Sequence, residues 1–246
     1  MSRNSHPGAM LIGELQLTAG TWFPEHEHPV HQLVWSARGV VAVKSGDAGW
    51  VLPPTRALWM PAGVPHRTGA LGRAALRGIY ADPALSPVSW PAPRLVVVRP
   101  LLRELLEYLT GDGITEPARL RAESVAFDLL EPLDVVPIVV PSPADPRARD
   151  VERAILANPA DPRCLAEFGR DVGAAERTLA RIFVRECRMP FGTWRTQVRL
   201  RASLPLLAQG APMEAVAHRV GYSSASAFVA AFRRSVGVTP GAYFAE

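Results

Sequence analysis

The sequence predicts a two-domain α+β protein, in which a β-barrel with accessory helices precedes an all-helical domain. Short alternating apolar segments dominate residues 10–90, whereas apolar residues spaced i, i+3, i+4 dominate the last hundred residues. Between them lies PIVVPSPADP, which carries four prolines between residues 137 and 146 and is typical of a stiff, extended linker. With 246 residues and 48% apolar content, the chain is long enough for a core in each half.

The first domain, residues 1–93, is predicted to be built from short strands. Glycine, proline and aspartate separate the apolar segments, as in the SGDAG of residues 45–49. The expected strands are Met10–Thr18, Leu33–Trp35, Val40–Lys44, Trp50–Leu52, Ala57–Met60 and Ala74–Tyr80. Turn signals at such regular spacing favour a barrel or a sandwich.

Histidine spacing adds a resemblance to this half of the chain. Five residues match the spacing of the first cupin motif: Gly20, His26, His28, Gln32 and Gly39. Three match the P-x-G-x-x-H core of the second motif: Pro61, Gly63 and His66. Gln32 replaces the glutamate of the cupin pattern, and Thr55 replaces one of its glycines. The domain therefore resembles a cupin barrel.

The same histidines suggest a binding site. Residues two apart on a strand share a face, so His26 and His28 would point together, and His66 from a facing strand could complete a three-imidazole cluster. Three imidazoles with an open position suit Zn, Ni, Mn or Fe. Gln32 is a poorer fourth ligand, and His31 would serve instead if the strand bulges. A histidine-lined effector pocket without metal, and hydrogen-bonded barrel histidines without any ligand, are the other two interpretations.

Residues 94–134 are predicted to be a helical segment. Helices are expected over Val98–Thr110 and Ala118–Leu130, each with a broad apolar face that must be buried against the barrel or a second subunit. The linker is assigned to residues 135–147, with a domain boundary near Ser142.

The second domain, residues 148–246, repeats one pattern twice. Ala217 precedes Gly221 by four residues, and Gly169 precedes Gly173 by four. A helix-turn-helix needs this combination, a small residue where the helices touch and a glycine in the turn. A buried triplet is expected after each turn: Leu179, Ile182 and Phe183, then Phe228, Ala231 and Phe232. The motifs are therefore placed at about residues 165–187 and 213–236, with Gly237 ending the last helix.

Two further helices complete this domain. Arg147–Ala157 should form the first, and a long helix over about Pro190–Gln209 should connect the two motifs. Pro205 lies inside the connecting helix, where proline removes a backbone hydrogen bond, so a kink or a local break is expected.

The helical half is also the basic half. Residues 147–246 hold 15 Arg against 9 Asp and Glu (+6), whereas residues 1–146 hold 12 Lys and Arg against 14 acids (−2). Arginine pairs with guanine edges and phosphates, and serine holds phosphates, so double-stranded DNA is the expected partner. The predicted DNA contacts are Arg177, Thr178, Arg181, Arg185, Ser223, Ser224, Ser226, Arg233 and Arg234.

The run GYSSASAFVAAFRRSVGVTP, residues 221–240, is close to the signature of the AraC/XylS family of transcription regulators, and residues 148–246 resemble that family's DNA-binding domain. Arg188 departs from the family pattern, because it stands where a turn glycine is usual. The resemblance implies a homodimeric one-component regulator with an N-terminal sensor of a metal or small molecule, in which residues 94–134 are the helical dimerisation segment. It also implies that the two recognition helices enter successive major grooves.

Two other functions remain open from the sequence. A cupin metalloenzyme of the dioxygenase or isomerase type could be fused to a DNA-binding domain, although the missing glutamate and the lack of another catalytic constellation favour a protein that is not an enzyme. The second is a co-regulator that binds protein rather than DNA, in which the arginine-rich helix faces would have no role in binding.

Cysteine usage and hydropathy bear on the compartment. Cys164 and Cys187 lie 23 residues apart without a CxxC motif, which favours free, partly buried thiols in a reducing cytosol. No signal peptide or membrane span is visible, so a cytoplasmic protein without a membrane partner is expected.

Overall fold

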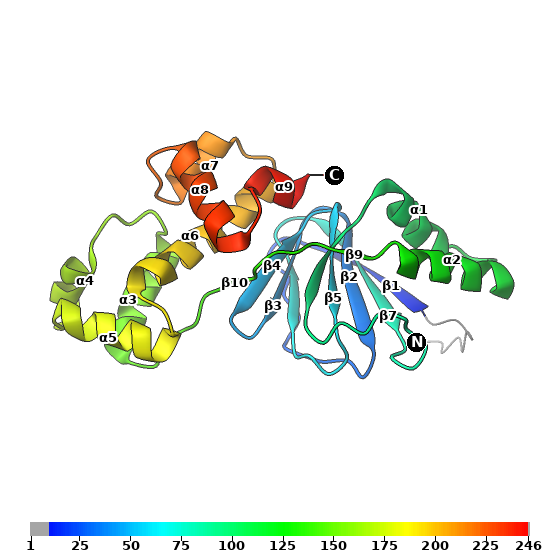
Figure 1. Cartoon of the computed structure of the whole chain (residues 1–246), viewed down its shortest axis with the longest axis horizontal. Helices are drawn as coiled ribbons and strands as arrows, with labels where there is room; N and C mark the ends of the chain where they lie inside the picture. Colours follow the sequence, from blue (N-terminus) through cyan, green and yellow to red (C-terminus); the bar gives the residue numbers. More distant parts are fainter. Residues whose placement is uncertain (1–9, 246) are drawn as a thin grey trace. The chain divides into compact units, whose positions relative to one another are not determined.

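The computed structural model describes residues 10–245 (Figure 1), which form two compact units. One unit holds the described residues up to Gly46, Trp50–Asp134 and the residues from Phe244 onward; the other holds Asp47–Gly49 and Val135–Tyr243. The first is rich in strands and the second in helices, which confirms the predicted fold class.

Antiparallel pairing builds two sheets. The larger has the order β1 (Met10–Leu17), β7 (Ala74–Ala81), β2 (His31–Arg38), β5 (Arg56–Met60), β8 (Arg94–Val97) and β9 (Glu131–Pro132). The smaller has the order β10 (Ile138–Val139), β4 (Ala48–Leu52), β3 (Val41–Ser45) and β6 (Arg67–Ala70). All six predicted strands are present with shifted ends, whereas β6, β8 and the two-residue strands β9 and β10 are additional to the prediction.

Strand β2 shows how the larger sheet divides its two faces. Leu33 and Trp35 belong to the hydrophobic core cluster, whereas Gln32 lines a cavity on the other side. Successive side chains of a strand point to opposite faces, so one strand supplies both. The same alternation places Ile79 of β7 in the core and Tyr80 in the cavity wall.

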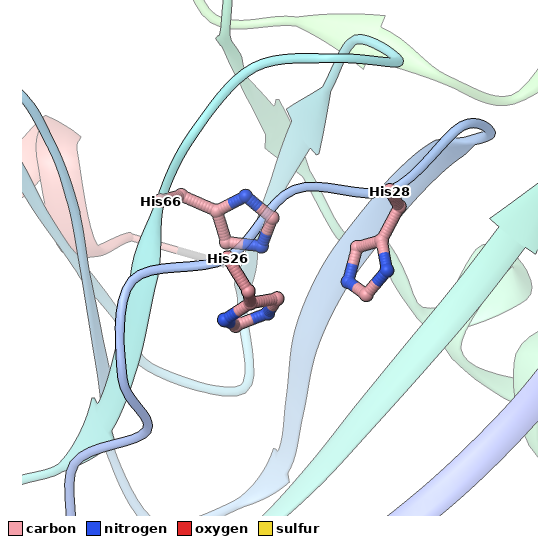
Figure 2. Close-up of side chains that lie close together, drawn as sticks. All are labelled: His26, His28 and His66. Carbon is pink, nitrogen blue, oxygen red and sulfur yellow. The ribbon is translucent and has the colours of Figure 1, made fainter.

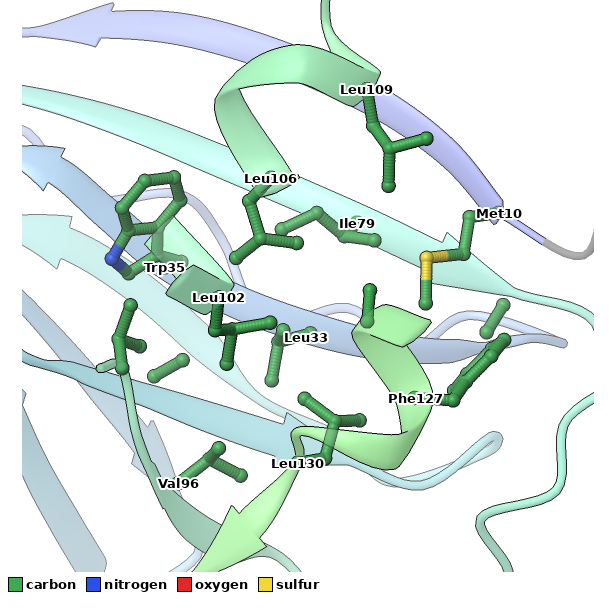
Figure 3. Packing of buried hydrophobic residues seen from close by; sticks show 14 of the residues in the cluster. Met10, Leu33, Trp35, Ile79, Val96, Leu102, Leu106, Leu109, Phe127 and Leu130 are labelled. Carbon is green, nitrogen blue, oxygen red and sulfur yellow. The ribbon is translucent and has the colours of Figure 1, made fainter. Parts of the chain in front are cut away.

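Helices α1 (Pro100–Leu109) and α2 (Glu116–Asp128) cover the core face of this sheet (Figure 3). Leu102, Leu106 and Leu109 of α1 pack with Phe127 of α2 and with strand residues such as Leu33. Each leucine buried this way contributes about 1.5–3 kcal/mol. Both helices agree with the prediction, and one apolar face of each is buried within its own unit.

The second unit contains seven helices among the described residues: α3 (Pro146–Ala157), α4 (Leu165–Asp171), α5 (Glu176–Cys187), α6 (Phe191–Ala208), α7 (Met213–Arg219), α8 (Ala225–Val236) and α9 (Pro240–Phe244). The pairs α4/α5 and α7/α8 are the two predicted helix-turn-helix motifs, and α6 contacts both α5 and α8. Both predicted triplets are buried.

The turn glycines adopt the conformation that the motif requires. Gly173 has φ +65° and Gly221 has φ +88°, a left-handed region that favours glycine. A Cβ on Gly169 would lie 2.4 Å from the carbonyl oxygen of Ala174, so the helix contact admits no larger residue. Gly237, with φ 94°, ends α8 as predicted.

Three details differ from expectation or refine it. Helix α6 continues through Pro205 to Ala208, so of the two expected outcomes the local break is wrong, whereas the kink stays a prediction. Arg188 has φ 59° and is the one non-glycine residue of positive φ within residues 10–245. Cys164 is exposed rather than partly buried, because it caps the N-terminus of α4, while Cys187 is buried.

Within residues 10–245, none of the helices has both the length and the apolar character needed to cross a membrane.

Candidate effector pocket and nucleic-acid interface

Three of the predicted ligands come together in the β-rich unit. One potential ligand atom from each of His26, His28 and His66 lies within 4.8 Å of the others. Their ring centroids are 4.5 Å apart for His26 and His66, 4.9 Å for His26 and His28, and 5.5 Å for His28 and His66. Figure 2 shows the three imidazoles grouped between neighbouring segments of the chain.

The convergence does not arise from one strand, so the predicted alternation of His26 and His28 along a strand is wrong. His26 and His66 form an isolated antiparallel bridge, in which the amide of His26 donates to the carbonyl of His66 at 3.0 Å and the reverse bond is 2.8 Å. His28 lies beyond this bridge in a loop, and its carbonyl accepts from the amide of Gly63. Pro24 and Pro29 flank the segment and have no N–H for a ladder, so a regular strand cannot form there.

Backbone carbonyls orient two of the rings. His26 Nδ1 lies 2.8 Å from the carbonyl oxygen of Pro24, and His66 Nδ1 lies 3.0 Å from that of Val64. A carbonyl can only accept, so each Nδ1 carries a proton, and in the neutral form of either ring the lone pair lies on Nε2. Metal-binding histidines are commonly held this way. The Nε2 atoms of His28 and His66 are buried without a hydrogen-bond partner in the described structure.

Burial also favours the neutral imidazole. Desolvation lowers the pKa of His28, and the neighbouring rings of His26 and His66 lower it further. Desolvation likewise lowers the pKa of His66, against a smaller opposing effect of its bond to Val64. Neutral rings with free lone pairs can coordinate a cation or accept hydrogen bonds from a ligand.

A cavity of about 330 Å³ adjoins the cluster, because His26 is part of its wall. The remaining lining is Leu15, Phe23, Pro24, Gln32, Thr68, Leu76 and Tyr80. Gln32 is 5% exposed, and its Oε1 is a further buried acceptor without a partner. An apolar wall with a few convergent polar atoms is typical of a small-molecule pocket.

Tyr80 is a site residue that the sequence reasoning missed. It lies opposite Gln32 in the β2/β7 register and shares a side-chain hydrogen bond with it. Burial raises the pKa of Tyr80, and the bond from Gln32 opposes that rise. A Cβ on Gly78 would lie 2.8 Å from the Tyr80 hydroxyl, so glycine lets the ring lie against the strand. Only the strand register, which the sequence does not show, reveals this pairing.

His31 is not part of the cluster. Its Nδ1 accepts a hydrogen bond of 3.0 Å from the amide of Ala62, and its ring lies 5.1 Å from that of Trp59. The metal-ligating groups found among the described residues include His26, His28 and His66 but not His31.

Helix α5 presents a cationic outer face. The side chains of Arg177 and Arg181 are exposed and make no hydrogen bond or ion pair with the described residues, while Thr178 is half-buried. Arg185 is exposed but pairs with Glu186. The other carboxylate oxygen of Glu186 accepts the amides of Ala144 and Asp145 at 2.8 and 3.0 Å. Arg177 and Arg181 are therefore the arginines of this helix that are available to another molecule.

Helix α8 presents small residues followed by two arginines. Ser223 and Ser226 are exposed, and Ser224 caps the helix by accepting the amide of Ala227 at 3.2 Å. Arg233 and Arg234 are exposed in the last turn. A groove of about 750 Å³ runs along this face, lined by Ala225, Ser226, Val229, Ala230, Arg233, Arg234, Gly237 and Thr239.

A β-rich unit with a small-molecule pocket, combined with two helix-turn-helix motifs on a basic unit, defines a DNA-binding regulator with a separate ligand-binding domain. Residues 11–130 match the AraC-like ligand binding domain, and residues 168–246 match a helix-turn-helix domain. The chain is 31% identical over 227 residues to the HTH-type transcriptional regulator NimR of Escherichia coli K12, covering 91% of this chain and 82% of that protein. It belongs to the AraC/XylS family of transcription regulators.

Other similar proteins match a smaller part of the chain or have a lower identity. The HTH-type transcriptional regulator RipA of Corynebacterium glutamicum is 37% identical over 103 residues, which cover 42% of this chain and 31% of RipA. A structure of ToxT from Vibrio cholerae covers 96% of this chain and 97% of its own at 11% identity, with a TM-score of 0.40.

Proposed function

We propose that this transcription regulator binds its effector at the cluster of His26, His28 and His66 and contacts operator DNA with the outer faces of α5 and α8. The effector site is supported by three buried hydrogen-bond acceptors that have no partner: His28 Nε2, His66 Nε2 and Gln32 Oε1. A buried acceptor without a partner costs about 1–3 kcal/mol, so a bound ligand that satisfies three of them would be strongly favoured.

A divalent transition metal (Zn, Ni, Mn or Fe) fits this donor set. Three neutral imidazoles with an open position form a common coordination set, and the amide oxygen of Gln32 is a neutral addition to it. His26, His28 and His66 would hold the ion, which would supply a positive charge and an open coordination position beside the cavity. Alternatively, the effector is an organic molecule bound without metal. Its N–H or O–H groups would donate to the same acceptors, and its apolar part would fill the cavity.

Metal analysis of the purified protein tests the first form. We expect about one equivalent of metal per wild-type chain after incubation with Zn²⁺ and removal of excess, and much less for His28→Ala. His218→Ala is the matched control, because His218 is an exposed histidine of α7 whose Nε2 lies 3.4 Å from Glu214. Equal zinc in all three proteins would refute a metal at this cluster.

We also propose that the protein is a homodimer formed through α1 and α2. Several large apolar side chains of these helices are exposed: Leu101 at 59%, Tyr108 at 48%, Leu120 at 42% and Val125 at 43%. Leu105 and Leu129 are partly buried and pack against the core of their own unit. Sedimentation of the full chain should give a dimer for the wild type and a monomer for Leu120→Glu, with both proteins folded by circular dichroism.

NimR and RipA are both named as transcriptional regulators. We therefore propose a regulator and assign no residue a catalytic role.

A further inference from the structure

The two recognition helices, α5 and α8, are built on one plan but present different chemistry. Counted from the first residue of each helix, positions four, seven and eight are the buried triplets in both. Positions two and six point outward in both. They are Arg177 and Arg181 in α5, but Ser226 and Ala230 in α8.

These positions matter because the N-terminal part of a recognition helix contacts base edges in the major groove. Arginine there donates two hydrogen bonds to O6 and N7 of guanine, whereas alanine makes an apolar contact with the methyl group of thymine. Other exposed residues near the start of each helix favour the same bases. Glu176 of α5 can accept from N4 of cytosine, and Ala227 of α8 adds a second methyl group.

The arginines of α8 occupy a different place. Arg233 and Arg234 are the ninth and tenth residues of the twelve-residue helix, at the far end of its groove from Ser226. A guanidinium beyond the base-reading turns meets the sugar–phosphate backbone, which carries no sequence information directly. With small residues at positions two, three and six, α8 can bring its backbone close to the bases, while Arg233 and Arg234 hold the phosphates.

We propose that each operator half-site has two chemically distinct parts: guanine–cytosine pairs beneath α5, and adenine–thymine pairs read through thymine methyl groups beneath α8. This inference rests on the proposed DNA contact by the outer faces of the two helices. Helix α6 contacts both α5 and α8, and its 18 residues span about 27 Å at 1.5 Å per residue. The two parts should therefore lie about one helical turn of DNA apart.

Selection from a pool of random-sequence duplexes with the full-length protein identifies the site even though the operator sequence is unknown. We expect an enriched guanine-containing block and an enriched thymine-containing block about 10 base pairs apart. An enriched site without this separation would overturn the inference and leave DNA binding intact. A pool with no enriched sequence would overturn sequence reading by these faces, and with it the proposed function.

Base analogues then test each contact without altering the protein. Replacing guanine by 7-deazaguanine removes one acceptor, and should weaken binding by about 5- to 100-fold in the α5 block. Replacing thymine by deoxyuracil removes only a methyl group, and should weaken binding about fourfold in the α8 block. Each analogue should have little effect in the other block. A deoxyuracil site bound as tightly as the thymine site would refute the methyl contact.

A protein variant assigns the blocks to the helices. In Arg181→Ala, the 7-deazaguanine effect at one guanine should disappear, whereas the deoxyuracil effect should remain. Arg153→Ala is the charge-matched control, because Arg153 is an exposed arginine of α3, outside both helix-turn-helix motifs. If Arg181→Ala responds to both analogues as the wild type does, α5 does not read guanine through this residue.

Discussion

Trp194 of α6 donates a hydrogen bond from Nε1 to the carbonyl oxygen of Pro141 at 2.8 Å. The thiol of Cys187 approaches the same oxygen at 3.6 Å, and Glu186 accepts the amides of Ala144 and Asp145. The proline-rich segment predicted to be a linker is therefore held by side chains of α5 and α6, so its last residues are fixed to the unit that carries the helix-turn-helix motifs.

Substitution of Trp194 should show how much its hydrogen bond to Pro141 contributes to the free energy of unfolding. Trp194→Phe keeps a buried aromatic ring but leaves the Pro141 carbonyl without its strong donor, and should reduce the free energy of unfolding by about 1–3 kcal/mol. Urea unfolding of the full chain measures it. Trp22→Phe, at a half-buried tryptophan, is the matched control, with a loss expected below about 1 kcal/mol. Equal losses in the two variants would contradict the assigned role of the Trp194 hydrogen bond.

Two helical glycines should respond in opposite directions to alanine. Gly169→Ala forces a methyl group against the carbonyl of Ala174, 2.4 Å away, and should destabilise the protein by about 1–3 kcal/mol. Gly192 of α6 has no atom within 4 Å of a built Cβ, so Gly192→Ala should stabilise by about 0.5–1 kcal/mol. Thermal unfolding of both variants tests the pair, and a stable Gly169→Ala protein would show that α4 and α5 can separate at little cost.

Replacement of Arg188 by glycine should stabilise the protein. Its φ of 59° crowds the Cβ of an L-residue, a cost of about 1–2 kcal/mol that glycine avoids, part of which is offset by the greater freedom of glycine in the unfolded chain. We expect Arg188→Gly to raise the free energy of unfolding by about 0.5–1 kcal/mol. Arg188→Ala keeps the backbone strain and should change little, so a similar gain in both variants would point to the lost charge instead.

The two cysteines should differ in reactivity. Burial, followed by the charges of Glu152, Glu186 and Asp47, raises the pKa of Cys187 to about 11, whereas Cys164 is exposed. At pH 8 about one Cys187 thiol in a thousand is ionised. A chromogenic disulfide reagent should therefore label one thiol per native chain quickly and the second only after denaturation. The fast phase should vanish in Cys164→Ser; its persistence would place the reactive thiol at Cys187.

The same raised pKa predicts how stability depends on pH. The folded pKa of about 11 exceeds the ordinary value of 9.0, so the unfolded chain loses the Cys187 proton first as pH rises. The contribution of this thiol is fully present below about pH 9 and is lost between about pH 9 and 11. The difference in unfolding free energy between the wild type and Cys187→Ala should shrink over that interval, and a constant difference would argue against the raised pKa.

The helical half could be predicted in detail because its signals are local. Gly173, Gly221 and the apolar triplets all act within a few residues of the turns that they define, so reading the chain segment by segment locates the motifs. Arg188 could be recognised as an exception only through the family resemblance, which places a turn glycine at this position, and its φ of 59° agrees with that.

The pocket could be predicted only in part. His26, His28 and His66 come together, but through a bridge between distant segments rather than through strand alternation, and metal binding there remains a prediction. Strand β6 has the sequence RTGA, whose pattern is not typical of a strand and which is ordered by pairing with β3. Tyr80 joins the site through its register with Gln32. Such features depend on long-range pairing, which no local pattern encodes.

The pairing of β1 with β7 has a consequence for how the protein is made. Strand β1 is the first of the described strands to leave the ribosome, yet its register partners run from Ala74 to Ala81, and among the described strands it pairs with β7 alone. A nascent chain that has not reached Ala74 therefore carries β1 without a partner. Closing so long a loop is slow compared with forming the hairpin of β3 and β4, so β1, a wall of the pocket through Leu15, joins the sheet only after that hairpin has formed.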